Sequence, residues 1–331
     1  MSDVRIVEVS SSDDGIRLDK WFKANFPEIP FGNLQKLMRT GQIRVDGGRV
    51  KSGMRLETGQ KIRVPPIKTL PDLGKVNAKP SLRSISKIDL EIIQRSVLHR
   101  DDNIIVINKP AGLAVQGGSG TSRHVDGMLD GLRFESPERP KLVHRLDKDT
   151  SGVLVLARNS KSARRLTELF RTKDIRKLYW ALSVGVPNPG DGLIDLRLIK
   201  SPGRHGEQMA VDEINGKRAK TRYKVLDQAG RRVSLLSLEP LTGRTHQLRV
   251  HLANALATPI VGDGKYGGNT AFLDGGGIEK KLHLHARRIL IPVTDREFVD
   301  VTAPISEHFR TSLEYLGFYI KEDYDRFLDL D

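Results

Sequence analysis

The segment between Pro65 and Ser86 most constrains the fold of this chain, because it lacks apolar periodicity and divides the sequence into two unequal parts. Its prolines, glycine and basic residues are typical of a flexible linker. A length of 331 residues also favours two domains, since a single hydrophobic core seldom serves so long a chain. We therefore expect a leader at residues 1–14, a small domain at 15–66, a basic linker at 67–88 and a large domain at 89–331.

The composition is that of an ordinary globular protein, with 38% hydrophobic and 29% charged residues. The chain has no cysteine, which excludes disulfides, a thiolate nucleophile and zinc sites that require sulfur ligands. Residues 1–15 include four acidic side chains and no apolar run, so we expect neither a signal peptide nor a membrane anchor. A cytoplasmic location and a monomeric state are the default expectations.

Positive charge is concentrated in the N-terminal quarter of the chain. The formal net charge is +14, and the residues from Gly15 to Ile88 include sixteen Lys or Arg against five Asp or Glu, which gives +11. Such an imbalance favours a polyanionic partner, nucleic acid before membrane. Charge bias alone is equally consistent with a solvated, lysine-rich surface, so the motifs must decide.

The local pattern of the N-terminal part predicts two helices followed by a hairpin. Apolar residues between Ile16 and Phe26 share one helical face, which predicts a short amphipathic helix. A second helix is expected from Asn33, a good N-cap, to Gly41, where a glycine can adopt the left-handed conformation that ends a helix. The period then changes to two, which predicts strands at 43–45, 49–51 and 61–64.

This order of two helices and a basic hairpin resembles an S4 RNA-binding domain. Arg17-Leu18-Asp19 and the helix that ends in glycine match the S4 pattern, whereas Phe31-Gly32, the Asp46-Gly47-Gly48 turn and Gln60 depart from it. The resemblance implies that the small domain binds RNA. Its candidate RNA-binding residues are Arg17, Lys20, Lys36, Arg39, Arg44, Arg49 and Lys51.

The large domain is dominated by predicted strands. Strands are expected at residues 103–108, 153–157, 178–184, 219–226, 232–238 and 288–293, and a helix at 161–172 with Ser160 as its cap. Strands without βαβ alternation predict an α+β domain with a mainly antiparallel sheet. The glycine-rich loop at residues 116–121 matches neither a P-loop nor a dinucleotide fingerprint, so it is at best a loop on the substrate side.

The strongest chemical motif is Val143-His144-Arg145-Leu146-Asp147-Lys148-Asp149-Thr150-Ser151-Gly152, directly before a predicted strand. A lone aspartate in such a turn usually caps backbone N–H groups or pairs with a neighbouring arginine. The whole string, however, resembles the His-Arg-Leu-Asp signature of RluA-type RNA pseudouridine synthases. The resemblance implies that Asp147 is the catalytic carboxylate.

Three further segments resemble the same family in the order in which the family uses them. The segment 177–182 matches the one that carries the active-site tyrosine, here Tyr179, and the segment 242–252 matches the motif whose arginine, here Arg249, pairs with the catalytic carboxylate. The segment 282–286 matches a short motif that follows. The candidate substrate-binding residues within these motifs are His144, Arg145, Arg244, His246 and Gln247.

The family's reaction converts uridine to pseudouridine, and it requires neither a metal nor another cofactor. The carboxylate can act as a nucleophile at the sugar or the base, or stabilise charge while a sugar proton leaves, and the sequence does not choose among these. A cationic partner such as Arg249 would keep Asp147 ionised. Tyr179 offers a flat face for the extruded base and a phenol that can move a proton.

Within the family, Arg63-Val64-Pro65-Pro66 and the loop at residues 117–120 are more similar to the C-type than to the D-type enzymes of the large ribosomal subunit. The implied partner is 23S ribosomal RNA.

Two other classes of protein remain open. One is a metal-dependent hydrolase that uses His246, His251, His283 and His285, although no matching acidic ligands accompany them. The other is a ribosome-assembly factor that binds RNA without catalysis.

Overall fold

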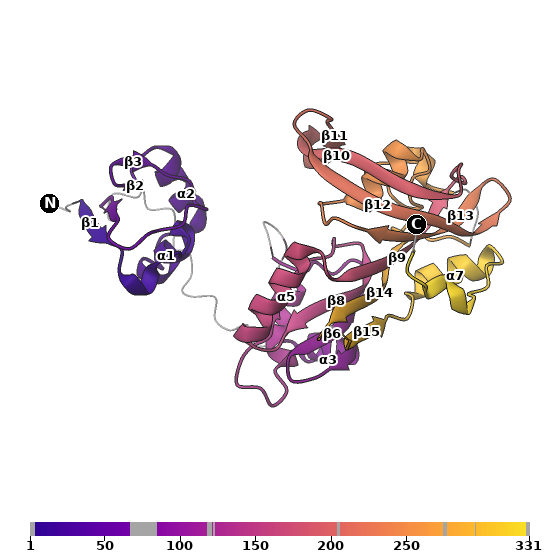
Figure 1. Ribbon diagram of the computed structural model, residues 1–331, viewed down its shortest axis with the longest axis horizontal. Coiled ribbons are helices and arrows are strands. Elements are labelled where there is room, and N and C mark those ends of the chain that lie inside the picture. Colours follow the sequence, from indigo (N-terminus) through magenta and orange to yellow (C-terminus); the bar gives the residue numbers. More distant parts are fainter. Residues whose placement is uncertain are drawn as a thin grey trace. The chain divides into compact units, whose positions relative to one another are not determined.

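The computed structural model describes residues 4–66, 85–117, 121, 123–203, 206–273, 277–294 and 296–328. The chain divides into two compact units, Met1–Arg83 and Ser84–Asp331 (Figure 1). Most of the linker expected at residues 67–88 lies outside the described residues, and its last two residues already belong to helix α3, Lys87–Arg95. Within the described residues, no helix is both long and apolar enough to cross a membrane.

The N-terminal unit combines two helices with a small antiparallel sheet. The helices are α1, Leu18–Asn25, and α2, Phe31–Arg39. The strands are β1, Arg5–Glu8, β2, Arg44–Val45, β3, Gly48–Arg49, and β4, Lys61–Val64, in the order β1-β4-β2-β3. The apolar faces of both helices and of the strands share one core, in which Trp21 and Phe22 are buried completely.

Two expectations for this unit are corrected. A separate leader at residues 1–14 is wrong, because β1 pairs along its whole length with β4 and so belongs to the sheet. The second helix begins at Phe31 after Pro30, not at Asn33, because a proline with an extended backbone already sets the entry to the helix. Its end agrees with the expectation, since Gly41 adopts a φ of +71° directly beyond it.

The large unit is built around one extended sheet. Its strands are β5, Val97–Arg100, β6, Ile104–Lys109, β7, Lys141–Leu142, β8, Ser151–Ala157, β9, Arg176–Val184, β10, Asp191–Gly203, β11, Gly206–Val211, β12, Lys217–Ala229, β13, Val233–Pro240, β14, Leu284–Pro292, and β15, Phe298–Thr302. The order is β11-β10-β12-β13-β9-β14-β8-β6-β5, with β15 on β14 and β7 on β8. All of these pairs are antiparallel except β8 with β14, which confirms the predicted α+β fold with a mainly antiparallel sheet.

Helices pack against several parts of this sheet (Figure 1). Besides α3, the unit contains α4, Val125–Met128, α5, Ser160–Thr172, α6, Gln247–Val250, a π-helical turn, His251–Ala255, and α7, Glu307–Tyr315. Helix α5 lies against β8, and its cap is Asn159 rather than the expected Ser160, because the Asn159 side chain accepts the N–H of Ser162 at 2.8 Å.

The centre of the sheet requires glycine at one position. Gly152 in β8 has a φ of +105°, and a Cβ atom there would overlap the backbone of Ala286 in β14. Only a residue without a side chain allows the two parallel strands to approach so closely. This crossing fixes where the turn before β8, which contains Asp147, leaves the sheet.

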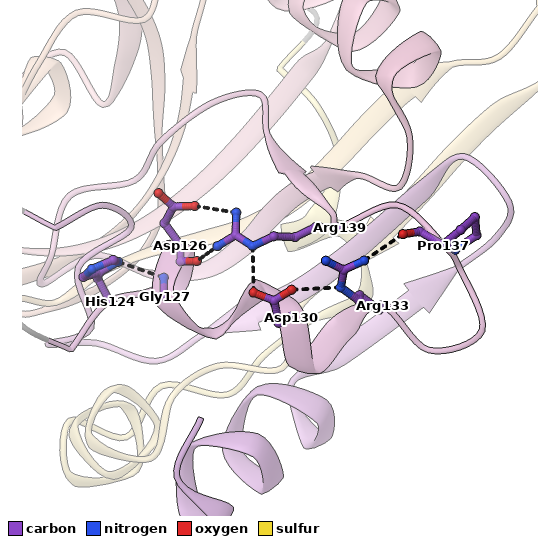
Figure 2. Close-up of polar contacts among 7 residues, drawn as sticks. All are labelled: His124, Asp126, Gly127, Asp130, Arg133, Pro137 and Arg139. Atoms are coloured by element: carbon purple, nitrogen blue, oxygen red, sulfur yellow. Dashed lines mark hydrogen bonds and ion pairs between the residues drawn. The ribbon is translucent and has the colours of Figure 1, made fainter. Parts of the chain in front are cut away.

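An ion-pair network holds the segment that leads into that turn (Figure 2). The carboxylate of Asp130 accepts hydrogen bonds from Arg133 at 2.8 Å and from Arg139 at 3.0 Å, and Arg139 also bonds the side chain and the carbonyl of Asp126. Burial acts to raise the pKa of Asp130, but the hydrogen bonds from both arginines outweigh it and lower the pKa. Arg139 lies two residues before β7, so the network anchors the start of the β7–β8 connection.

Candidate active site

The connection between β7 and β8 contains Asp147, whose side chain is about one-fifth exposed (19%). The neighbouring carbonyl of Lys148 accepts hydrogen bonds from the N–H of Gly112 at 2.9 Å and from the ammonium of Lys109 at 3.0 Å. Lys109 lies at the end of β6, so the turn is fixed by a strand that neighbours its own in the sheet. The backbone beside Asp147 is therefore held in place from within the unit.

Lys109 is completely buried, and its ammonium donates hydrogen bonds to three backbone carbonyls. Besides Lys148, it donates to Pro110 and Leu113, both at 2.9 Å, so its three N–H bonds are matched by three acceptors. Burial lowers the pKa of Lys109 to about 7, while the negative charges of Asp149 and Asp147 act in the opposite direction. The Lys109 side chain thus holds the aspartate-containing turn through the carbonyl of Lys148.

Asp147 and Tyr179 line the same cavity, which has a volume of about 330 Å³. Tyr179 comes from β9, in the middle of the sheet, and its backbone pairs with β13 and β14. Burial and the negative charge of Asp147 raise the pKa of the Tyr179 phenol, so it stays protonated at neutral pH. A neutral aromatic ring and a carboxylate thus face one hollow that is the size of a small ligand.

His246 lies between Asp147 and the partly buried Tyr266. Its Nε2 atom is 3.8 Å from Oδ2 of Asp147, and its Nδ1 atom is 2.7 Å from the hydroxyl of Tyr266. That hydroxyl already accepts the N–H of Met209 at 3.0 Å, so its own proton is available to Nδ1. This arrangement places the remaining ring proton on Nε2, facing Asp147.

His246 adopts a left-handed backbone conformation, with a φ of +51°, directly before α6. A non-glycine residue in this region carries strain that the surrounding contacts must offset. Burial lowers the pKa of His246, and the opposing charge of Asp147 does not reverse this shift. The ring is therefore neutral at pH 7.

Arg249 does not form the expected ion pair with Asp147. Its Nε and Nη2 atoms instead donate to both carboxylate oxygens of Asp263, at 2.8 and 2.7 Å. Both side chains are buried, at 8% and 1% exposure, and Asp263 offers the two oxygens that a planar guanidinium prefers. Arg249 still lines the cavity with Asp147, and the charge of Asp147 contributes to raising the pKa of Arg249.

The five expected substrate-binding residues all line the cavity, but they differ in what their side chains do. Arg145 and Arg244 are exposed at its rim. His144 stacks on Phe170, with ring centroids 4.3 Å apart, and its Nε2 atom accepts the N–H of Val155 at 2.8 Å. Burial lowers the pKa of His144 to about 3, so this ring is a neutral part of the cavity wall.

Gln247 is buried, and both ends of its side-chain amide bond to the protein. The oxygen accepts from Thr242 at 2.7 Å and from the N–H of Arg244 at 3.0 Å, while the nitrogen donates to Lys220 and Thr221. Gln247 thus ties the loop at residues 242–246 to β12, and its contact with substrate stays a prediction.

The seven candidate RNA-binding residues lie in the N-terminal unit, and all of them are exposed. Arg44 and Arg49 come from the β2–β3 hairpin and face each other across it in register. Arg44 donates to the carbonyl of Gly41 at 3.0 Å, and Arg17 pairs with Asp19 at 2.7 Å. The unit thus presents several cations to solvent with few acidic partners.

Comparison with known proteins decides the family. The RNA pseudouridylate synthase family profile matches residues 103–254. A protein from Salmonella typhi named ribosomal large subunit pseudouridine synthase C is 33% identical over 320 residues, 95% of this chain and 97% of that one. The chain belongs to the RNA pseudouridylate synthase family. It is therefore an RNA pseudouridine synthase, an isomerase.

Other relatives agree with this assignment. A pseudouridine synthase C from Haemophilus influenzae is 34% identical over 268 residues, 80% of each chain. The solved structure of human RNA pseudouridylate synthase domain containing 4 is 33% identical, superposes with a TM-score of 0.60, and covers 70% of this synthase and 97% of that chain. The human domain containing 1 is 31% identical with a TM-score of 0.51, over 63% and 83% of the two chains.

The synthase fold also accounts for three of the four histidines that suggested a metal site, all but His251. His283 bonds Ser312 at 2.8 Å and His285 bonds Ser151 at 2.8 Å, while His246 bonds Tyr266 in another part of the unit. In the described ranges, no three His, Cys, Asp or Glu residues are grouped so that they could hold a metal ion. Family membership likewise replaces the hypothesis of a factor without catalysis.

Sequence reasoning gave no role to several residues of this synthase that surround Asp147. Lys109 and Tyr266 find their partners, which are backbone groups and a histidine, on other strands and loops. A lysine that ends an otherwise apolar strand was the one available signal for Lys109. Nothing in the sequence pairs Tyr266 with Met209 or Asp263 with Arg249.

Proposed function

We propose that this synthase converts specific uridines of large-subunit (23S) ribosomal RNA to pseudouridine, with Asp147 as its catalytic carboxylate. The single observation that carries the catalytic assignment is the cavity that Asp147 shares with Tyr179 and Arg249. The substrate is supported by relatives that are named as large-subunit enzymes and align over nearly the whole chain. The proposal includes a cytoplasmic location, because the proposed substrate is a ribosomal RNA.

The chemistry is an isomerisation in which every atom of the uridine is retained. The bond from N1 to the anomeric carbon breaks, the base turns, and C5 bonds to the same carbon. The proton that leaves C5 is balanced by the proton that N1 gains. An ionised Asp147 serves either as the nucleophile or as the base at the sugar, and both routes need the carboxylate in contact with the nucleoside.

The remaining residues of the cavity fit this reaction in named roles. The ring of Tyr179 supports the extruded base, and its protonated phenol is within the same hollow. Arg249 adds positive charge near Asp147 while Asp263 fixes its direction. The exposed Arg145 and Arg244 at the rim are placed to contact the RNA backbone.

The N-terminal unit is proposed to be an S4-type RNA-binding domain. Its two helices, its basic hairpin and the exposed Arg44 and Arg49 support this role. Cations on one small unit would add phosphate contacts without reading sequence, and so raise the affinity for RNA before the target base leaves its stack.

The test is to map pseudouridines in the ribosomal RNA of a strain that lacks the gene. We expect specific large-subunit positions to lose the modification and to regain it when the wild-type gene, but not Asp147→Asn, is returned. If every ribosomal pseudouridine persisted in the deletion strain, the proposed substrate would be wrong.

A further inference from the structure

A basic wall flanks the cavity on the side of β9. Lys177 and Tyr179 are two residues apart in this strand, so their side chains emerge on the same face, and both line the cavity. Lys173, which ends α5 with a φ of +71°, lines it as well. A second hollow of about 330 Å³ shares Lys173, Lys177 and Thr242 with the first.

The ammonium of Lys177 has no hydrogen bond or ion pair within the described part of the chain, although most of the residue is covered. Glu239, the acidic residue that lines the second hollow, already has other partners. Glu239 forms a two-point pair with Arg176, at 2.8 and 3.0 Å, and accepts the N–H of Leu328 at 3.1 Å. Burial lowers the pKa of Lys177 to about 8. The negative charge of Glu239 acts to raise this pKa, and the positive charge of Lys173 lowers it further.

An unpaired ammonium in a largely covered position is costly unless an anion joins it. The proposed reaction assigns no role to Lys177. Lys220, the third lysine of the second hollow, pairs with Asp195 at 3.4 Å. No residue in the part of the chain that the structure describes supplies this partner, so a bound ligand is the candidate. It must also be small enough for the hollow and negatively charged.

We propose that Lys177, together with Lys173, binds the phosphodiester that adjoins the target nucleotide. This inference rests on the proposed function, because it places a uridine of RNA against Tyr179. Two residues along a strand span about 6.6 Å, which lies within the reach between a nucleobase and the phosphate of its own nucleotide. A phosphate there would neutralise the covered ammonium and fix the sugar against Asp147.

The experiment is a double-mutant cycle between the lysine and single RNA linkages. The protein variant is Lys177→Gln. The RNA is a short fragment that contains a uridine identified by the mapping experiment. In two modified versions of this RNA, the phosphodiester on the 5′ or on the 3′ side of that uridine is replaced by a neutral methylphosphonate. RNA affinity and the single-turnover rate are measured for each pair. The control is Lys161→Gln, which changes an exposed lysine on α5 outside the cavity.

We expect Lys177→Gln to weaken binding or slow turnover roughly tenfold on normal RNA, the scale of one hydrogen bond to a charged group. On RNA with one of the two neutral linkages, the variant and the wild type should agree within about twofold, because the partner is already absent. Lys177→Arg should retain most of the wild-type values, and Lys161→Gln all of them. Thermal unfolding confirms that each variant is folded.

Two results would overturn this subsite. One is an equal loss for Lys177→Gln on normal RNA and on both neutral linkages. The other is a variant that loses binding of inorganic phosphate alone but behaves as wild type on every RNA, which would make free phosphate the ligand. Failure of the proposed function can be told apart from failure of this subsite, because in that case even the wild-type enzyme would modify no uridine in the RNA.

Discussion

The Nε2 atom of His246 lies 3.8 Å from a carboxylate oxygen of Asp147, and the opposite ring nitrogen is held by Tyr266 at 2.7 Å. Because Tyr266 accepts an N–H from Met209, it donates to His246 and directs the imidazole proton toward Asp147. The position of that proton is thus set by a residue that does not itself contact Asp147.

Tyr266→Phe removes the hydroxyl and keeps the ring, so the imidazole of His246 is free to change tautomer and direction. We expect the single-turnover rate to fall about tenfold while RNA affinity is unchanged, since positioning is altered and the charged surface is not. The control is Tyr223→Phe, which loses a hydrogen bond to Pro189 away from the cavity. Nitrogen NMR of the His246 ring reports the tautomer, and an unchanged tautomer in Tyr266→Phe would contradict this interpretation.

The pair between Arg249 and Asp263 is buried, so its rupture should cost stability. In Asp263→Asn the guanidinium keeps its burial and loses its charged partner, and we expect the free energy of unfolding to fall by about 3–5 kcal/mol. Asp195→Asn, which breaks the exposed pair with Arg218, should cost at most about 1 kcal/mol. Chemical denaturation of both variants measures the difference, and similar losses would show that burial of the first pair is unimportant.

The buried ammonium of Lys109 should leave a signature in the pH dependence of stability. Its pKa is about 7 in the folded chain, against an ordinary value of 10.5. Between these values the unfolded state binds more protons than the folded state, so this group makes stability rise with pH across that window. Lys109→Met should be less stable overall, because three carbonyls lose their donor, and should lack this rise. Parallel pH profiles of wild type and variant would contradict the prediction.

The basic hairpin of the N-terminal unit should control the salt dependence of RNA binding. If Arg44 and Arg49 each contact one phosphate, replacing both with alanine should reduce the slope of log affinity against log salt by about 1.8 on duplex RNA or about 1.4 on single strands. The turnover of bound RNA should not change. Equal slopes for the variant and the wild type, measured between low and moderate salt, would show that the hairpin does not touch the backbone.

Local patterns were sufficient to predict much of this fold. The amphipathic face that includes Leu18 and Trp21 identified α1, and the change of period after Gly41 identified the hairpin, because both signals are contained within one element. Strand β1 was missed because Arg5–Glu8 is short and mostly exposed, and only its pairing with β4 makes it a strand. The long β10 was also missed, although Ile194, Leu196 and Leu198 alternate with the charged Asp195 and Arg197 as in a strand.

In the candidate site, too, the sequence predicted what lies within one segment but not the contacts between distant segments. The string around Asp147 and the tyrosine of β9 are recognisable in sequence, and the fold brings them into one cavity. The partner of Arg249 is not recognisable, because Asp263 lies beyond a turn and a guanidinium can pair with any carboxylate within reach. The unpaired state of Lys177 depends on Glu239 being occupied by Arg176, which only the packing of β9 against β13 reveals.

The central claim is that the carboxylate of Asp147 performs the chemistry. Asp147→Asn nearly preserves shape but removes both nucleophilicity and charge, so binding should survive and the rate should fall by several powers of ten, each worth about 1.4 kcal/mol of barrier. The neighbouring Asp149→Asn, exposed in the same turn, is the matched control and should cost far less.

The measurement is single-turnover formation of pseudouridine in a defined ribosomal RNA fragment, with RNA binding and thermal unfolding followed in parallel. We predict that Asp147→Asn binds the fragment and is folded but forms no pseudouridine, while Asp149→Asn remains active. Conversion by Asp147→Asn at a rate near that of the wild type, or a folded Asp149→Asn that is the inactive variant, would contradict the assignment.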